Sequence, residues 1–450
     1  MNPTSSKGEN PELAAGGKDK AAPAGSAYSW VVVGLLWLVC FFSYADRQAF
    51  FSVFPLLHRE MGITTVQLGM LGSSFAILYG LGGPFAGYVV DHVRRKTAIL
   101  GGLELWSVIC MLSALSRDFA QLLLFRASEG LGETIYYPAA LSMVGDYHGR
   151  RSRSRAMGIL QTSVYAGTVG GGYWAGAIAQ SHGWRAALFA FGAMGSLLGL
   201  GLIRLLREPV RGSADAAAGP GEREPAARQA LALGDIRSLF AIRSFLALMG
   251  VFACANFVAL VLLTWMPTFL YSRFHLSLAN AAFDAAVYPQ VASIAGSFAG
   301  GYLADLFARR DVRGRVWVQC GGMLAGAPFV ALSGLSGSLK LTIFALALWG
   351  FCKGVYDSNI FAAAFDVVPV KARGTASGLM NCIGWLIGGG TAPVTIGWLA
   401  GYLSLGQAIA ASASVYVVAG LALAAAGTKL LRRDFARAEA DFGPSGAALP

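Results

Sequence analysis

The sequence predicts an all-α integral membrane protein with twelve transmembrane helices in two pseudo-symmetric six-helix bundles. Hydrophobic residues make up 55% of the 450 positions and charged residues 13%, which is about half of the charged share in soluble domains. Apolar runs of about 20 residues, the length that spans a bilayer, recur along the whole chain. A short sequence pattern also recurs at matching places in the two halves, and it supports the division into two bundles.

The apolar runs define the expected helices. The first six are expected at 30–51, 66–90, 97–116, 119–144, 156–180 and 185–206. The second six are expected at 245–271, 280–305, 315–336, 341–366, 375–401 and 406–428. The resulting division is a tail over 1–26, a bundle over 27–208, a linker over 209–242, a bundle over 243–432 and a tail over 433–450.

The repeated pattern ends the second and the eighth expected helices. Phe85–Asp91 reads FAGYVVD and Gly300–Asp305 reads GGYLAD. Each leads into a basic loop, at Arg94–Lys96 and at Arg309–Arg310. The same arrangement at the same place in each half indicates an internal repeat.

Basic residues gather in alternate loops, although the net charge of +11 by itself would also fit a nucleic-acid-binding protein. The clusters are Arg94–Lys96, Arg150–Arg155, Arg204–Arg211, Arg309–Arg315, Lys371–Arg373 and Lys429–Arg437. This bias predicts a multi-pass protein of the cell membrane with both termini in the cytoplasm and no nucleic-acid partner. The tail over 1–26 has no apolar core, and we expect it to be disordered and not a signal peptide.

The chain lacks the residue patterns of enzymes, metalloproteins and nucleotide-driven pumps. Its five histidines fall in expected loops, and it has no P-loop or nucleophile-elbow serine. Its six cysteines lie in apolar runs without metal-ligand spacing, which is typical of buried small hydrophobes. We therefore expect no enzymatic activity, no cofactor and no metal, and a monomer.

Charged residues inside expected spans are the main indication of function. They are Asp46, Arg47, Arg126, Glu129, Glu133 and Asp357. A charge at the bilayer centre costs about 2.5–3.5 kcal/mol on insertion scales, so such residues pair, line a water-filled cavity or bind ions. Arginines beside carboxylates predict a site that holds an anion and a titrating proton together.

Several motifs resemble those of the major facilitator superfamily over nearly the whole chain. Gly87–Lys96 is similar to the family's signature between helices two and three, although His92 and Arg94 depart from the usual residues. Arg126–Glu133 resembles its fourth-helix signature. Gly167–Gly176 resembles its glycine-rich fifth helix, without the usual Gly-Pro pair. The resemblance implies a transporter that works by alternating access.

Two branches of that family share further features with the chain. Tyr44–Arg47 and Gly130–Glu133 are similar to both the spinster-like carriers and the anion:cation symporters. The first branch implies a carrier of lysolipid or another amphipathic lipid, and the second a proton-coupled carrier of a small organic anion. We favour the second; Na⁺ in place of H⁺ and the direction of transport stay open. A membrane sensor that has lost transport is a third reading, which no large signalling domain in the sequence supports.

The intramembrane charges suggest specific roles. We expect Asp46 and Glu133 to bind the coupling proton, and Arg47 and Arg126 to bind the anion or couple it to the proton, because guanidinium matches carboxylate bidentately. The alternative is that Asp46–Arg126 and Arg47–Glu133 are fixed structural ion pairs. Further expected substrate contacts are Tyr44, Tyr79, Gln161, Lys353, Asn359 and Asn381.

The remaining expected residues have structural or gating roles. Glu129 follows Arg126 by three positions and Asp357 follows Lys353 by four, so each is expected to form an ion pair within its helix. For Lys353, contact with substrate is the open alternative. Asp91, Arg95 and Asp305 are expected to gate, with Asp91 capping a neighbouring helix or pairing with Arg95 in the outward-facing state.

Overall fold

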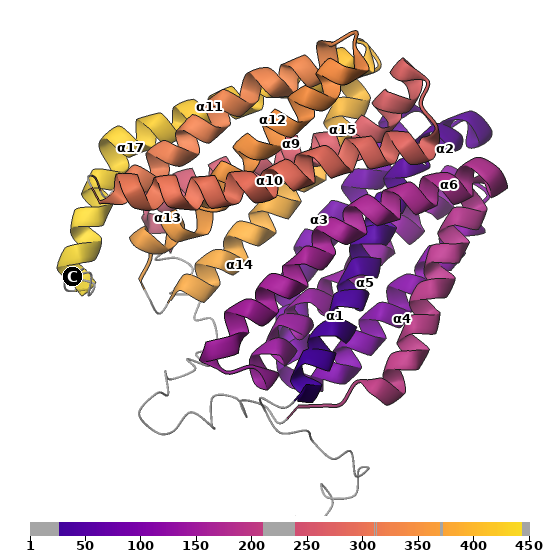
Figure 1. The fold of residues 1–450 in the computed structure, drawn as a ribbon, viewed down its shortest axis with the longest axis horizontal. Coiled ribbons are helices and arrows are strands. Elements are labelled where there is room, and N and C mark those ends of the chain that lie inside the picture. Colours follow the sequence, from indigo (N-terminus) through magenta and orange to yellow (C-terminus); the bar gives the residue numbers. More distant parts are fainter. Residues whose placement is uncertain (1–26, 210–238, 310, 312, 370–371, 443–450) are drawn as a thin grey trace, which may run out of the picture.

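The computed structural model describes residues 27–209, 239–309, 311, 313–369 and 372–442, and these form two bundles of helices (Figure 1). No β-strand occurs in the described part of the chain. The expected tail over 1–26 and most of the expected linker over 209–242 lie outside the described residues. The expectations for those two segments therefore stay predictions.

The first bundle follows the expected spans closely. Its helices are α1 (Ala27–Ser52), α2 (Phe54–Met61), α3 (Thr65–His92), α4 (Arg95–Ala114), α5 (Phe119–Tyr147) and α6 (Arg150–Leu205). The short α2 has no counterpart among the expected helices. The long α6 contains the fifth and sixth expected spans, because Gly183 adopts a positive φ of 83° and turns the chain back between them.

Three spans of the second bundle are interrupted where the sequence predicts continuous helices. Its elements are α9 (Arg243–Phe274), α10 (Leu278–Ala308), α11 (Gly314–Leu335), α12 (Leu339–Asp357), α13 (Ile360–Val367), α14 (Arg373–Ile383), the π-helix η3 (Gly384–Gly389), α15 (Gly390–Leu399), α16 (Leu405–Ala411) and α17 (Ala413–Phe442). The tenth span is divided between α12 and α13, and the eleventh among α14, η3 and α15. The twelfth starts in α16, and α17 runs past the expected end at 428 into the expected tail.

Ten helices of the described chain are long and apolar enough to cross a membrane. One of these ten is α6, which contains two spans in a single segment, and α5 is not among the ten. The charged residues of α5, which are Arg126, Glu129, Glu133 and Asp146, lower its hydropathy. With both spans of α6 and with α5, the expected twelve-helix architecture is confirmed.

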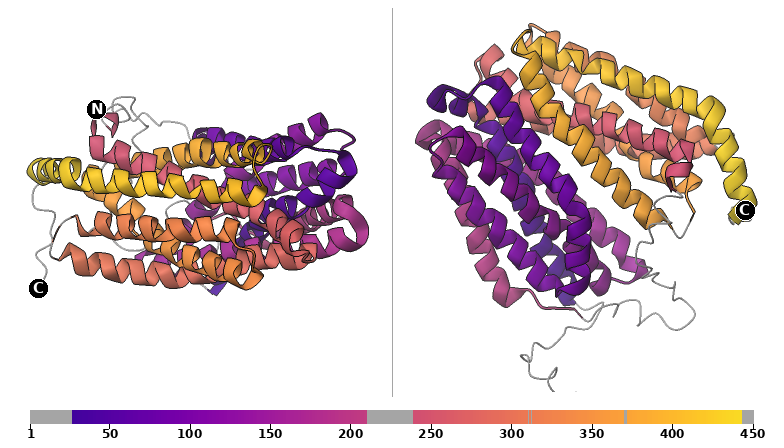
Figure 2. Two further views of the ribbon diagram at one scale, coloured as in Figure 1. Left: turned by 90° about the horizontal axis from the view of Figure 1, so that it is seen from above. Right: turned by 180° about the vertical axis from the view of Figure 1, so that it is seen from behind.

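The two bundles meet at one end of the molecule and part at the other. Figures 1 and 2 show them in contact where α3 and α10 begin and where α15 ends. A Cβ atom at Gly69 would lie 2.5 Å from the Pro393 carbonyl oxygen, and one at Gly176 would lie 2.6 Å from the Ala279 nitrogen. Glycine is therefore required for this closeness, and we call this contact region the closed end.

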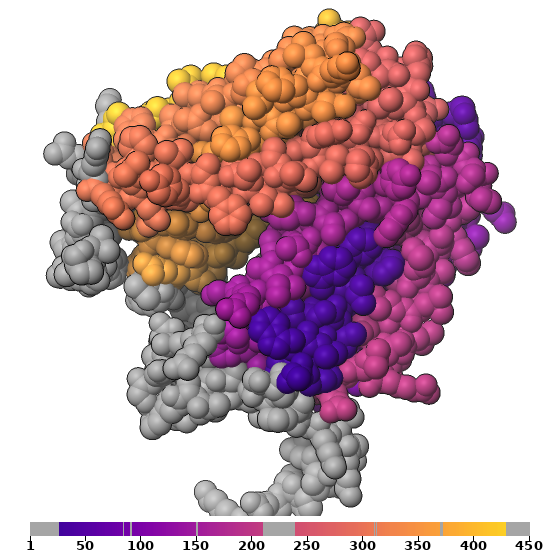
Figure 3. Space-filling view, in the orientation of Figure 1, coloured from indigo at the N-terminus to yellow at the C-terminus, as the bar shows by residue number. Residues whose placement is uncertain are grey.

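The opposite end, which we call the basic end, carries Arg95 at the start of α4 and Arg315 at the start of α11. There α14 and the lower parts of the first bundle diverge, and Figure 3 shows the gap between them. The structure thus shows one conformation of a two-bundle protein, closed at one end and parted at the basic end.

Candidate functional site

A cluster of buried charged side chains lies in the first bundle between α1, α4 and α5. Its members are at most 7% exposed: Asp46, Arg47, Arg126, Glu129 and Glu133. Glycines of α6 position α1 beside this cluster, because a Cβ atom at Gly171 would overlap the backbone of Ala45. Helix α6 therefore packs directly against the turn of α1 that carries Asp46 and Arg47.

Arg47 and Glu133 form a close ion pair within this cluster. Arg47 Nε donates to Glu133 Oε2 at 2.5 Å, and the Ser43 hydroxyl donates to the same oxygen at 2.9 Å. Arg47 Nη1 and Glu133 Oε1 have no hydrogen-bond partner among the described residues. The pair is therefore strong but incompletely satisfied, and each member has a polar atom left for another group.

Aromatic rings surround the Arg47 guanidinium. Its Cζ atom lies 4.7 Å from the ring centre of Tyr44, 4.9 Å from Phe75, 4.5 Å from Tyr79 and 5.3 Å from Trp385. Ring faces attract cations, so this aromatic box stabilises the charge of Arg47 out of water. Trp385 belongs to η3 of the second bundle, which places Arg47 at the contact between the two bundles.

Phe75 was not predicted from the sequence, yet it stacks on Tyr79 one turn away, with ring centres 5.9 Å apart. Its ring also lies 4.3 Å from the Cζ atom of Arg126, so it separates the two guanidinium groups. The spacing of four positions between Phe75 and Tyr79 on α3 was the available signal.

Arg126 pairs with Glu129 and not with Asp46. Its Nη1 donates to Glu129 Oε2 at 2.6 Å, which is the expected pair within the helix. Of the two ion pairs in the structural alternative, the structure therefore shows Arg47–Glu133 and not Asp46–Arg126. Arg126 Nε and Nη2 have no partner among the described residues.

Asp46 is held by α4. Its Oδ1 accepts a hydrogen bond from the Cys110 thiol at 2.9 Å, while its Oδ2 has no partner in the described part of the chain. Cys110 is buried, as expected for all six cysteines, although Cys254 and Cys382 are half-buried. The carboxylate oxygens of Asp46 and Glu129 and the sulfur of Cys110 all lie within 4.8 Å of one another.

The expected residues of the second bundle are arranged differently. Lys353 and Asp357 form their expected pair on α12, and both side chains are partly exposed. Asn359 is buried, and its amide donates to the backbone oxygens of Gly300 and Val355, each at 3.1 Å. Asn359 thus fastens the end of α12 to α10 in this conformation, and we do not assign it to the substrate site.

Gln161 and Asn381 are both exposed, on α6 and α14 respectively. Gln161 Oε1 accepts a hydrogen bond from Tyr137 at 3.4 Å, and the Asn381 amide donates to Ser377 O at 3.1 Å. Within the described part of the chain neither residue forms a hydrogen bond with the charged cluster, so their expected role as substrate contacts stays a prediction.

Ion pairs at the basic end repeat between the bundles. Arg95 at the start of α4 pairs with Asp146 at the end of α5. Arg315 at the start of α11 pairs with Asp366 in α13 at 2.8 Å, and Asp305 lies 4.0 Å from Arg315. Asp146 was not predicted from the sequence, and Asp366 was given no role. In each of the two pairs, however, the partners stand the same 51 positions apart in the sequence.

Glu208 caps the N-terminus of α4. The backbone nitrogens of Arg95 and Lys96 both donate to the Glu208 carboxylate, each at 2.8 Å. A carboxylate at a helix N-terminus satisfies the free N–H groups and the helix dipole. The side chain of Asp91, at the end of α3, lies outside the described residues, so its gating role stays a prediction.

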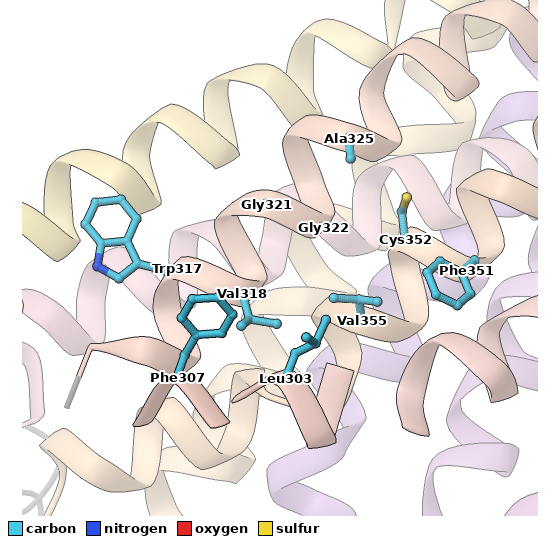
Figure 4. A pocket seen from close by; sticks show the side chains of 10 residues that line it. All are labelled: Leu303, Phe307, Trp317, Val318, Gly321, Gly322, Ala325, Phe351, Cys352 and Val355. Atoms are coloured by element: carbon cyan, nitrogen blue, oxygen red, sulfur yellow. The ribbon is translucent and has the colours of Figure 1, made fainter. Parts of the chain in front are cut away.

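An apolar cavity of about 310 Å³ lies in the second bundle among α10, α11 and α12 (Figure 4). Leu303, Phe307, Trp317 and Phe351 contribute the larger side chains of its wall. None of the expected site residues lines this cavity, and it contains no charged group. It is therefore separate from the charged cluster.

Two helical bundles that enclose charged side chains at their contact define a membrane transporter of the secondary class. The sequence model of the Major Facilitator Superfamily matches residues 36–393, and the chain belongs to this family. The motif resemblance described above is thereby confirmed. The members of this family are transporters and not enzymes.

Comparison with known proteins gives relatives from both expected branches. The chain is 27% identical to Protein spinster of Drosophila melanogaster over 382 residues, which cover 82% of this chain and 61% of that protein. It is 24% identical over 377 residues to the probable L-galactonate transporter of Escherichia coli K12, covering 81% and 82% of the two chains.

A solved structure shows the same fold. It is the inward-facing, unoccupied conformation of a bacterial homologue of the human lysosomal transporter Spinster. The two structures superpose with a TM-score of 0.80 at 23% sequence identity, over 91% of this chain and 99% of the other.

Proposed function

We propose that the protein is a proton-coupled secondary transporter of a small organic anion, working by alternating access. The observation that carries the proposal is Arg47, a buried guanidinium at the contact between the bundles with a free Nη1 atom and a carboxylate partner. A substrate carboxylate can replace Glu133 on Arg47 with bidentate geometry. The relative named for L-galactonate, a sugar acid, supports this class of cargo.

Proton coupling follows from the same exchange. When an anion takes Arg47, the buried Glu133 loses its counter-charge and an uncompensated carboxylate remains out of water. A carboxyl group in that position binds a proton more readily. We assign Glu133 and Asp46 to proton binding, with Arg126 coupling them through Glu129, and Tyr44 and Tyr79 to the substrate site beside Arg47.

The conformation supports alternating access. If the basic end faces the cytoplasm, as the distribution of Lys and Arg predicts, the parted end in Figure 3 is the inward one. In this proposal Arg95, Asp305 and Asp91 stabilise the closed form of the basic end in the outward-facing state. The protein resides in the cell membrane as a monomer.

A spinster-like carrier of an amphipathic lipid is the second candidate. The Drosophila relative favours it, and the cavity in Figure 4 has the apolar lining that an acyl chain requires. That cavity lies away from Arg47, so a lipid held there would not explain the buried charges.

The test is uptake into proteoliposomes of labelled sugar acids, dicarboxylates, aromatic acids and lysolipids, with a pH gradient, with a Na⁺ gradient and without either. We expect one of the organic acids to accumulate uphill with the pH gradient. Glu133→Gln should abolish this accumulation but keep exchange of labelled for unlabelled anion. Glu60→Gln, which removes an exposed carboxylate at the closed end, is the matched control. Transport of lysolipid alone, or wild-type accumulation in Glu133→Gln, would overturn the proposal.

A further inference from the structure

The buried charges of the first bundle do not balance. Three carboxyl groups, those of Asp46, Glu129 and Glu133, share the site with two guanidinium groups, those of Arg47 and Arg126. If all five are ionised, the site carries a net charge of −1 within the membrane. Charge imbalance at that depth is costly, so one further positive charge is needed in this conformation.

The contacts show where that charge is missing. Glu133 is matched by Arg47, and Glu129 is matched by Arg126. Among the described residues Asp46 forms no ion pair, and it lies beside Cys110 and Glu129 instead. The imbalance therefore falls on Asp46.

Carboxylate oxygens of Asp46 and Glu129 lie within 4.8 Å of each other, near enough for the two carboxyl groups to interact directly. Two ionised carboxylates in contact repel each other strongly in a low-dielectric site, and such a pair takes up one proton between its oxygens. The unpartnered Asp46 Oδ2 gives this proton a place, since Oδ1 already accepts from the Cys110 thiol.

We propose that Asp46 and Glu129 share one proton in the conformation seen here, so that Glu129 is part of the proton site and not a structural partner of Arg126 alone. Cys110 from α4 and Arg126 and Glu133 from α5 face this pair, and Arg47 from α1 pairs with Glu133. With one proton bound, these groups sum to zero net charge. For transport, the inference rests on the proton coupling proposed above; for proton occupancy, it stands independently.

A metal ion fits the pair less well than a proton. Hard cations take about six or more oxygen ligands, and this cluster presents two carboxyl groups and a thiol. The thiol is placed as a donor to Asp46, with Leu188 O as its second neighbour at 3.2 Å. A proton needs no further ligands.

The test is infrared difference spectroscopy of the purified protein at neutral pH without substrate, in H₂O and D₂O. We expect a carbonyl stretching band of a protonated carboxyl group that shifts in D₂O. The band should disappear in Glu129→Gln and in Asp46→Asn, because each variant removes one of the two carboxyl groups that share the proton. Asp357→Asn, which removes a carboxylate already paired with Lys353 in the second bundle, is the matched control and should keep the band.

Cys110→Ser provides a variant that keeps both carboxyl groups. A hydroxyl donates a stronger hydrogen bond to Asp46 than a thiol does, so the band should shift in frequency without loss. This variant assigns the band even if one of the carboxyl variants fails to fold.

The two proposals fail separately. A missing band in the wild-type protein, or an unchanged band in Glu129→Gln and Cys110→Ser, overturns the shared proton and leaves anion uptake untouched. A band that behaves as expected in a protein that accumulates no organic anion with a pH gradient overturns the proposed function and leaves the shared proton standing.

Discussion

The two bundles have the same architecture but differ in their central charges. In the first bundle α1 and α5 carry six buried charged side chains, five in the central cluster and Asp146 at the basic end. In the second bundle α9 has no charged residue between Arg243 and Arg273, and α12 carries the partly exposed Lys353–Asp357 pair. Buried charge is therefore concentrated in the first bundle, while the second contributes Trp385 to the surroundings of Arg47.

At the basic end, by contrast, the two bundles carry matching ion pairs. Arg95–Asp146 and Arg315–Asp366 connect matching helices with matching spacing. The two halves of the repeat therefore share the ion pairs at the basic end but differ in the charged residues at the middle of each bundle. The ion pairs of the basic end thus occur in both bundles, whereas the buried charged cluster belongs to the first.

The largest difference between the bundles is expected when one cation of each is neutralised and the loss of anion affinity is compared. Arg47→Gln should reduce anion affinity by roughly 100- to 4,000-fold, because removing one member of a buried pair costs about 3–5 kcal/mol. Lys353→Gln should change affinity less than about 5-fold, since its pair is partly exposed. Binding of the transported acid, measured by isothermal titration calorimetry, tests both. Equal losses would show that the charges of the two bundles act together.

Widening the closed end should have the next largest effect. In Gly69→Ala the new methyl group would overlap the Pro393 carbonyl, which disfavours the closed contact by about 1–3 kcal/mol. Double electron–electron resonance between labels on either side of the closed end should show a larger share of long distances. Gly83→Ala, on the same helix with nothing within 4 Å of its Cβ position, is the matched control. Unchanged distances in Gly69→Ala would contradict the required close approach.

The repeated pairs at the basic end predict two variants of similar effect. Asp146→Asn and Asp366→Asn each release an arginine that can pair across the gap when the basic end closes. Each variant should shift the open–closed ratio by about 1 kcal/mol, or roughly 5-fold, toward closure. Single-molecule distance measurements at the basic end give this ratio. A shift in one variant without the other would argue against a shared gate.

The smallest effect is expected where the second bundle loses a carboxylate. Asp357→Asn should lower the free energy of unfolding by less than about 1 kcal/mol, because Lys353 can still reach water. Glu133→Gln, which leaves Arg47 without its buried partner, should cost about 3–5 kcal/mol. Thermal unfolding in detergent compares the two. A cost for Asp357→Asn as large as that for Glu133→Gln would contradict the asymmetry between the bundles.

The sequence was sufficient for the fold because membrane spans need long apolar runs and their ends are marked by basic clusters. It did not predict the π-helix η3, since glycines at 384, 388 and 389 are equally compatible with a continuous α-helix. Nor did it predict the break between α12 and α13, where Asn359 binds the backbone of α10. Such interruptions depend on tertiary contacts that have no local signal.

The site could be predicted as a set of residues but not as a set of pairs. Spacing along α5 identified Arg126–Glu129, because both lie on one helix. Whether Asp46 meets Arg126 or Cys110 depends on how α1 and α4 are rotated against each other, and helical spacing does not specify that. Asp146 could have been predicted from the internal repeat, since Arg315 and Asp366 have the same separation in the sequence as Arg95 and Asp146.

Trp385 gives the Arg47 guanidinium a ring from the opposing bundle, so any rocking of the bundles changes the surroundings of this cation. A ring face contributes about 0.5–2 kcal/mol to a nearby cation, equivalent to roughly 2- to 30-fold in an equilibrium constant. By thermodynamic reciprocity, a ligand that competes with the indole for Arg47 must also alter the balance between orientations by the same factor. The indole fluorescence of this residue would then report occupancy and orientation together.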